Sequence, residues 1–369
     1  MDTKKNHSVN DQADPSAKPI TPMRLSSSHR LDLDHALIDL THGAGGRRTA
    51  DLIASVFTSQ FRHPALARAD DQAIVPFGPG ELALTTDSYV VTPLFFPGGD
   101  IGKLSVCGTI NDIAVGGAEP LYISVAFILE EGLPVRDLVR VVASMREVEA
   151  STGVHIVTGD TKVVERGKAD KMFVTTAGVG RVRDASRVRG AMHVKPGDAV
   201  VVSGHIGDHG VAVMSCRQHL GFETNVQSDC APLHDLVRVM LEAVPEIHCM
   251  RDPTRGGVAT LANEIAEASR VGIVLEEERC PVRSEVAAAC EILGLDPLYV
   301  ANEGLVVAFV EAHRASMLVD TMRTHPFGKN AEIIGTVVES HRPMVQLVSP
   351  YGGRRVLPWL SGEQLPRIC

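Results

Sequence analysis

The sequence predicts an α+β protein of two α/β domains followed by a flexible C-terminal tail. Its 369 residues exceed what one ordinary hydrophobic core accommodates and fit two domains of usual size. Short apolar strands alternate with amphipathic helices, and a charged, turn-forming segment at 181–198 interrupts the alternation once. We therefore expect a first domain over 37–184, a second domain over 185–348 and a tail over 349–369.

The chain begins with a polar segment, residues 1–36, which is rich in Ser, Asp, Lys and Pro and has no apolar periodicity. Such a segment cannot bury enough apolar surface to fold, so we expect a disordered extension. Ordered structure is predicted to begin near the glycine-rich turn "THGAGGRR" at 41–48, which leads into a helix.

The first domain is predicted to pack helices against a sheet. A helix is expected over 135–152, because its apolar residues recur at helical spacing and Gly153 follows it. The expected strands of this domain are 81–91, 122–129, 154–164 and 171–180.

The second domain repeats the alternation of strands and helices. Its expected strands are 199–204, 272–276, 304–310 and 331–338. Two expected helices cover 233–244 and 312–324. Two others begin after the turns at 205–210 and 251–257. After 348, Gly and Pro are dense enough to exclude a helix or a central strand.

Charge and composition narrow the class of protein. The formal net charge is −9 and no run of Lys or Arg is present, which argues against nucleic acid as the main partner. No stretch approaches eighteen apolar residues and the first residues lack the apolar block of a secretory signal, so we expect a cytoplasmic protein.

The cysteines draw attention to the end of the chain. The seven cysteines are scattered without a CxxC pair, which argues against a disulfide framework and a zinc site. Cys369 is the last residue, and no chain beyond it holds it in a core. We therefore expect its thiol to be available for chemistry.

Acidic or glycine-rich turns recur along the chain, and several place an Asp where a strand is expected to end. Each one alone is explained by local turn capping. Together they favour Mg²⁺ and a nucleotide, because Mg²⁺ prefers carboxylate and phosphate oxygens and neighbouring carboxylates repel unless a cation joins them. The turns lie at 41–48, 69–75, 85–90, 109–117, 158–164 and 251–257.

These turns, in this order, closely resemble the HypE family of hydrogenase maturation proteins, which are carbamoyl dehydratases of the PurM-like (aminoimidazole ribonucleotide synthetase) superfamily. The resemblance runs over 37–369 and is carried by "TTDSYVVTPLFFPGGDIGKLSVCGTINDIAVGGAEP", "FILEEGLP", "TGDTKVV", "RDPTRGG" and the closing "PRIC". It implies two PurM-like domains, the first an ATP-binding domain whose sheet pairs in a homodimer.

The resemblance also implies the reaction. The enzyme would use ATP to dehydrate an S-carbamoyl group on its own Cys369 to a thiocyanate. A HypF-like carbamoyltransferase would load the thiol. The cyanide would pass to the iron of a [NiFe]-hydrogenase held by a HypC–HypD-like scaffold.

The resemblance assigns roles to individual residues. Cys369 would be the acceptor, while Lys162 and Glu303 would handle the protons of the carboxamide. From the residues alone, a solvated loop lysine explains Lys162 equally well, and a turn residue before a strand explains Glu303 somewhat better. The residues implied for ATP are His42, Gly43, Gly45, Gly46, Thr86, Asp87, Asn111, Asp112, Gly159, Asp160 and Asp252. Those implied for Mg²⁺ are Asp71, Asp87, Asp112, Asp160 and Asp252.

Two other functions stay open at this stage. The first is a kinase or cyclo-ligase of the same superfamily that acts on a free small molecule, with Cys369 incidental. The second is a non-catalytic carrier that offers its terminal thiol to partners and binds ATP only for structure.

Overall fold

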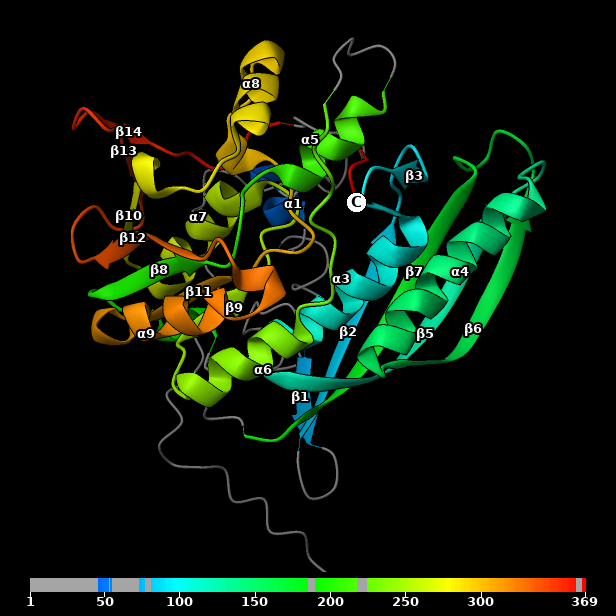
Figure 1. Cartoon of the computed structure of the whole chain (residues 1–369), viewed down its shortest axis with the longest axis horizontal. Helices are drawn as coiled ribbons and strands as arrows, with labels where there is room; N and C mark the ends of the chain where they lie inside the picture. The colour runs from blue at the N-terminus through cyan, green and yellow to red at the C-terminus, as the bar shows by residue number, and fades with distance from the viewer. Residues whose placement is uncertain are drawn as a thin grey trace, which may run out of the picture.

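A computed structural model gives the fold as two sheet-based domains that lie beside each other (Figure 1). The predicted α+β class is confirmed. No helix in the described part of the chain is long and apolar enough to cross a membrane. The expected N-terminal extension lies outside the described residues. The structure describes residues 46–52, 54, 73–76, 81–184, 190–217, 224–362 and 367–369.

The first domain is built on a five-stranded sheet in the order β1-β2-β7-β5-β6, in which only β5 and β6 are parallel. Helices α3 (Ile101–Val115) and α4 (Val135–Thr152) cover one face of this sheet (Figure 1). Two short strands, β3 and β4, pair with each other beside it. The strands are β1 (Ala73–Pro76), β2 (Glu81–Tyr89), β3 (Phe95–Phe96), β4 (Gly99–Asp100), β5 (Ala118–Glu130), β6 (His155–Val164) and β7 (Met172–Val182).

Helix α3 was not predicted. Almost all of its residues are buried, so it has no polar face and no helical periodicity in its sequence. It begins at Asp100, whose carboxylate accepts hydrogen bonds from the amides of Gly102 at 2.7 Å and Lys103 at 3.0 Å. The expectation that Asn111 and Asp112 sit in a turn after a strand is therefore wrong, because both lie on this helix.

The second domain is built on a seven-stranded sheet in the order β14-β13-β10-β12-β8-β11-β9. Helix α7 packs on one face and helices α6 and α9 on the other, which explains the continuous apolar runs of β8 and β11. The strands are β8 (Asp198–Val202), β9 (Cys249–Arg251), β10 (Gly272–Glu276), β11 (Val307–Glu311), β12 (Glu332–Val338), β13 (Val345–Val348) and β14 (Arg354–Val356). The helices are α5 (Asp208–Ser215), α6 (His234–Ala243), α7 (Gly257–Ser269), α8 (Ser284–Leu293) and α9 (Ala312–Arg323).

The packed part of the second domain extends beyond the predicted boundary at 348. Strand β14 adds to the sheet as an edge strand beside β13, a position that tolerates the nearby prolines. Leu357 and Leu360 are buried in the core, and the Leu360 carbonyl accepts a 3.0 Å hydrogen bond from the Arg47 amide of α1 (Arg47–Leu52). The segment over 349–360 is thus part of the domain rather than a free tail.

Candidate active site

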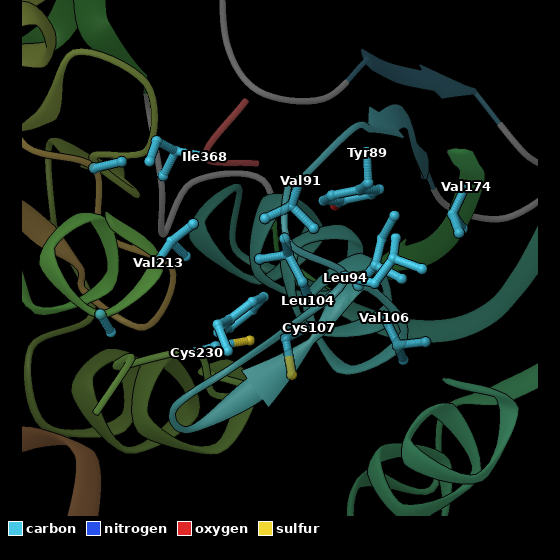
Figure 2. Close-up of a cluster of buried hydrophobic side chains, with 14 of the residues drawn as sticks. Tyr89, Val91, Leu94, Leu104, Val106, Cys107, Val174, Val213, Cys230 and Ile368 are labelled. Atoms are coloured by element: carbon cyan, nitrogen blue, oxygen red, sulfur yellow. The ribbon is translucent and has the colours of Figure 1, made fainter. Parts of the chain in front are cut away.

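The last three residues of the chain lie between the two domains, close to α5 and β3 (Figure 1). Ile368 is 3% exposed and belongs to an apolar cluster together with Val91 of the first domain and Val213 of α5 (Figure 2). Cys369 is half-buried and packs against the same cluster. The terminal thiol therefore has a defined position in the protein.

The Cys369 thiol points into a charged pocket. It hydrogen-bonds to the carboxyl group of Glu303, with Arg255 and Asp87 nearby. Burial is the largest cause that raises the thiol pKa, to about 12, and Glu303 adds to it while Arg255 opposes it. The docked thiol is therefore protonated at neutral pH and is a poor nucleophile.

Glu303 is the most deeply buried acid of this pocket, at 3% exposed. Its backbone is fixed, because the carboxylate of Asp229 accepts hydrogen bonds from the amides of Glu303 at 3.0 Å and Gly304 at 3.1 Å. Among the described residues, its Oε1 has no hydrogen-bond partner. Burial, followed by Asp252, Asp229 and Asp87, raises the pKa of Glu303 well above its ordinary value. This arrangement suits a group that exchanges a proton with a ligand.

Two further carboxyl groups beside Glu303 have raised pKa values. Burial raises the pKa of Asp252 to about 6, where Arg251 opposes the shift and Asp87 adds to it. Burial also raises the pKa of Asp229 to about 7, against the two backbone hydrogen bonds that it accepts. Acids crowded in this way favour a cation among them.

Asp87 and Asp112 come from the first domain and lie near the same tyrosine. The Tyr89 hydroxyl donates a 3.0 Å hydrogen bond to Asp87, and the Thr85 hydroxyl donates a 2.6 Å bond to Asp112. Burial raises the pKa of Tyr89, and the charges of both carboxylates and of Glu303 raise it further. These predicted ligands are thus brought to one pocket.

Arg255 was missed by the sequence analysis, although it stands in the quoted turn "RDPTRGG". It lies just before α7, and the neighbouring Cys369 is the largest cause that raises its pKa, with Asp87 and Glu303 adding to the effect. The sequence could have indicated Arg255 by its charge, because a cluster of buried acids requires a cation near it. Asp252 in the same turn drew attention only as an acid.

The sheet register separates three predicted residues from this pocket. Asp87 pairs with Thr176, in the row that faces α3, whereas Asp160 pairs with Ala126 in the next row, on the open face. Lys162 pairs with Ile128 on that open face, where it forms a 3.0 Å ion pair with Asp160. Both side chains are exposed, at 70% and 62%, while Glu303 is buried. The expected grouping of Lys162 with Glu303 is therefore not found within one protomer.

Thr86 also lies on the open face, because it pairs with Ala177 one row away from Asp87. Its hydroxyl donates a 2.8 Å hydrogen bond to the Thr176 carbonyl. The Thr86 side chain thus has a hydrogen-bond partner within the sheet, and it does not lie in the pocket.

Several other predicted ligands have structural roles. A side chain at Gly159 would come within 2.4 Å of the Val125 carbonyl oxygen, and one at Gly46 within 2.2 Å of the Leu360 carbonyl oxygen. Close packing thus explains both glycines. The Asn111 side chain joins the domains by donating to the carbonyl of Ala231 at 3.0 Å and accepting from the amide of Leu233 at 2.8 Å. His42, Gly43, Gly45 and Asp71 lie outside the described residues.

The carboxylates fit a hard cation by their chemistry, but they do not enclose one. Over the described ranges, no group of three or more His, Cys, Asp or Glu residues is arranged to hold a metal ion. Asp87, Asp112 and Asp252 would hold Mg²⁺ only together with further oxygen ligands, such as nucleotide phosphates.

Comparisons with known proteins give the chain relatives over nearly its whole length. Residues 69–182 match the family "AIR synthase related protein, N-terminal domain", and 195–348 match its C-terminal domain. Carbamoyl dehydratase HypE of Azotobacter vinelandii is 53% identical over 340 residues, which are 92% of this chain and 99% of the relative.

Two solved structures are also similar. A crystal structure of a HypE–HypF complex has a TM-score of 0.79 and 47% identity, and it covers 84% of this chain and 99% of that chain. A crystal structure of hydrogenase maturation protein HypE in complex with ATP has a TM-score of 0.76 and 45% identity, over 89% of this chain and 98% of that chain.

Proposed function

The chain belongs to the HypE family of carbamoyl dehydratases, and we propose that it dehydrates an S-carbamoyl group on its own Cys369. In this reaction R–S–CO–NH₂ and ATP give R–S–C≡N, ADP and phosphate. The carbonyl oxygen leaves with the phosphoryl group and the nitrogen loses two protons. The cyanide would be the iron ligand of a [NiFe]-hydrogenase.

One observation carries the proposal: the terminal thiol lies against Glu303 and Arg255 inside its own protein. An incidental cysteine at the end of a chain has no reason to sit between a buried acid and a guanidinium group. A carrier that only presents its thiol would keep it exposed. The docked position instead suits a substrate held for chemistry.

The reaction would need bound ATP and three contributions from the protein, which are a cation, a base and a dry site. Bound ATP would supply the phosphoryl group that turns the amide oxygen into a leaving group. Arg255 would donate hydrogen bonds to the oxygens on which negative charge develops. Glu303, with its unpartnered Oε1, would accept a proton from the carboxamide nitrogen. Burial among apolar side chains would exclude water from the site.

Mg²⁺ is proposed to bind beside the nucleotide phosphates. Asp87, Asp112 and Asp252 would be its protein ligands, with Asp71 as a further one. The cation would offset the charge of the phosphates and of the crowded carboxyl groups.

Loading of the thiol is proposed to take place with the tail withdrawn. The docked thiol has a pKa of about 12 and is half-buried, so a loading enzyme would find little thiolate there. We propose a HypF-like carbamoyltransferase as the loading partner, which the similar structure of a HypE–HypF complex supports. A HypC–HypD-like scaffold would receive the cyanide in the cytoplasm.

A homodimer is proposed to form through the first domains. The open face and edge of their sheet expose large apolar side chains, which a second copy would cover. Lys162 and Asp160 lie on the same face, so we propose that they serve the pocket of the partner protomer rather than their own. The exposed apolar residues are Tyr122 at 47%, Ile128 at 39%, Val157 at 59% and Val163 at 68%.

The proposal is tested by the intact mass of the protein after incubation with the loading enzyme, carbamoyl phosphate and ATP. We expect the gain of one carbamoyl group on Cys369, followed by the loss of one water. The Cys369→Ser variant is the control and should gain nothing. Turnover of a free small molecule by a chain that lacks residues 367–369 would instead favour the kinase or cyclo-ligase.

A further inference from the structure

The end of the chain is held by contacts that do not involve the Cys369 thiol. The Arg367 carbonyl oxygen accepts hydrogen bonds from the Thr92 amide at 3.1 Å and from Arg217 Nη2 at 2.9 Å. Arg217 also donates to the Thr92 carbonyl, from Nε at 3.1 Å and from Nη2 at 3.0 Å. One guanidinium thus ties the tail to the 92 segment of the first domain.

The Arg367 side chain has its own partner. Its guanidinium forms an ion pair with Asp170, which precedes β7. The same Asp170 oxygen accepts a 2.7 Å hydrogen bond from the Thr92 hydroxyl. The carboxylate is therefore oriented by the body of the protein and not by the tail alone.

The Ile368 carbonyl is recognised by a buried histidine. His209 Nε2 lies 2.9 Å from this oxygen, and His209 Nδ1 lies 2.8 Å from the Ser228 hydroxyl. Burial lowers the pKa of His209 to about 4, so the ring is neutral at neutral pH. Because a carbonyl only accepts, Nε2 carries the hydrogen and Nδ1 accepts from Ser228, whose oxygen accepts from the Cys230 amide at 3.0 Å. The docked tail is thus bound by the tautomer of His209 that carries its hydrogen on Nε2.

The backbone of Arg367 adopts a conformation that needs such support. Its φ is 54°, in the left-handed region that non-glycine residues rarely occupy. Such a residue persists where surrounding contacts over-determine it. The contacts at Asp170, Thr92 and His209 thus select one register, with Ile368 in the apolar cluster and Cys369 at Glu303.

We propose that these residues form a receptor for peptides that end in Arg-Ile-Cys. The receptor also binds this sequence when it is supplied as a separate peptide. Asp170 selects the arginine, the apolar cluster selects the isoleucine, and His209 sets the position of the final residue. His209 and Asp170 are positioning residues for the reaction. This inference rests on the proposed function in one respect only, which is that Cys369 carries a carbamoyl group during the reaction.

The first test measures docking in the full chain, without ATP or a carbamoyl group. Cys369 is alkylated with iodoacetamide and quantified on the C-terminal fragment cut after Glu363. Arg367→Asp and Asp170→Arg should each raise the rate by about tenfold or more, because each breaks a charge-assisted contact. The double variant should return to within about twofold of the wild-type rate, because it restores the pair with reversed charges. An unchanged rate in Arg367→Asp, or no rescue in the double variant, would overturn the proposal.

The second test supplies the tail as a separate molecule. Full-length Arg367→Asp, whose own tail is released, is titrated with a fluorescent peptide of residues 363–369. We expect one peptide per protomer, and binding weaker by about tenfold or more to the wild-type chain, whose own tail occupies the site. The double variant should also reject the peptide. Equal binding to all three chains, or to none of them, would contradict a separable receptor.

His209 is tested with an isosteric pair of variants. Gln places an amide N–H near the position of Nε2, whereas Leu fills the volume without a donor. His209→Gln should keep the slow alkylation of Cys369, and His209→Leu should speed it about tenfold. Equal rates in two equally stable variants would remove His209 from the receptor. All three readouts are independent of dehydration, so their failure would leave the proposed function untouched.

Discussion

The Cys369 thiol hydrogen-bonds to the Glu303 carboxyl group in a pocket between the two domains. The two groups reach it from different directions, one on the end of the chain and the other just before β11. Burial raises the pKa of both groups. A carbamoyl group on this sulfur would be delivered next to a strong proton acceptor.

Replacement of Glu303 by glutamine should stop the dehydration. The amide keeps the shape of the side chain but cannot accept a proton, so we expect the rate to fall by about 10²–10⁴-fold. The measurement is the loss of one water from carbamoylated Cys369 by intact mass. Glu285→Gln, an exposed acid in the first turn of α8, is the matched control and should react at the wild-type rate. Full activity in Glu303→Gln would remove this residue from the mechanism.

Arg255 should matter more for reaction than for folding. Its guanidinium lies beside Cys369, so Arg255→Met should lower the single-turnover rate by about 10²-fold, and Arg255→Lys should recover only part of it. The exposed Arg146→Met provides the comparison. A variant with normal dehydration kinetics would contradict the role assigned to this cation.

The stability of the protein should depend on pH through Asp229. Its pKa is about 7 in the folded protein and near 3.8 when unfolded, so only the folded state holds the proton between these values. The folded state therefore loses stability as the pH rises from 4 to 7, by on the order of 2 kcal/mol after allowance for partial exposure. Asp229→Asn cannot titrate, and its denaturant unfolding should show a flatter pH dependence. Parallel pH curves for the two proteins would exclude this assignment.

Lys162 should act across the dimer. We expect Lys162→Ala and Cys369→Ser to be inactive separately, and a mixture of the two to regain activity. In the mixed dimer, one pocket combines the tail of the first variant with the lysine of the second. Complementation is measured as the water loss from the Cys369-bearing chain. An inactive mixture of verified mixed dimers would return Lys162 to a role within its own protomer or to none.

Sequence reasoning succeeded where the pattern is local. The helix that ends before Gly153 was predicted, because it is amphipathic and Gly153 ends it in the left-handed conformation with φ 71°. It failed at α3, which is buried on all sides and so carries no periodic signal. An apolar run of that kind is read as a helix only when its surroundings are known.

The candidate site was predictable in composition but not in arrangement. Asp87, Glu303 and Cys369 lie close together in the structure. Asp160 and Lys162 are on the other face of the sheet, and only the strand register reveals this. Arg255 belongs to the site because of partners that are distant in sequence.

The most direct test follows the carbon atom itself. The protein is loaded with ¹³C-carbamoyl on Cys369 and its ¹³C NMR spectrum is recorded before and after addition of ATP and Mg²⁺. We predict that the carboxamide signal is replaced by a thiocyanate signal that remains attached to the protein, and that Glu303→Gln retains the carboxamide. A carboxamide signal that persists in the wild-type protein, or a label released as a free small molecule, would contradict self-dehydration at the docked tail.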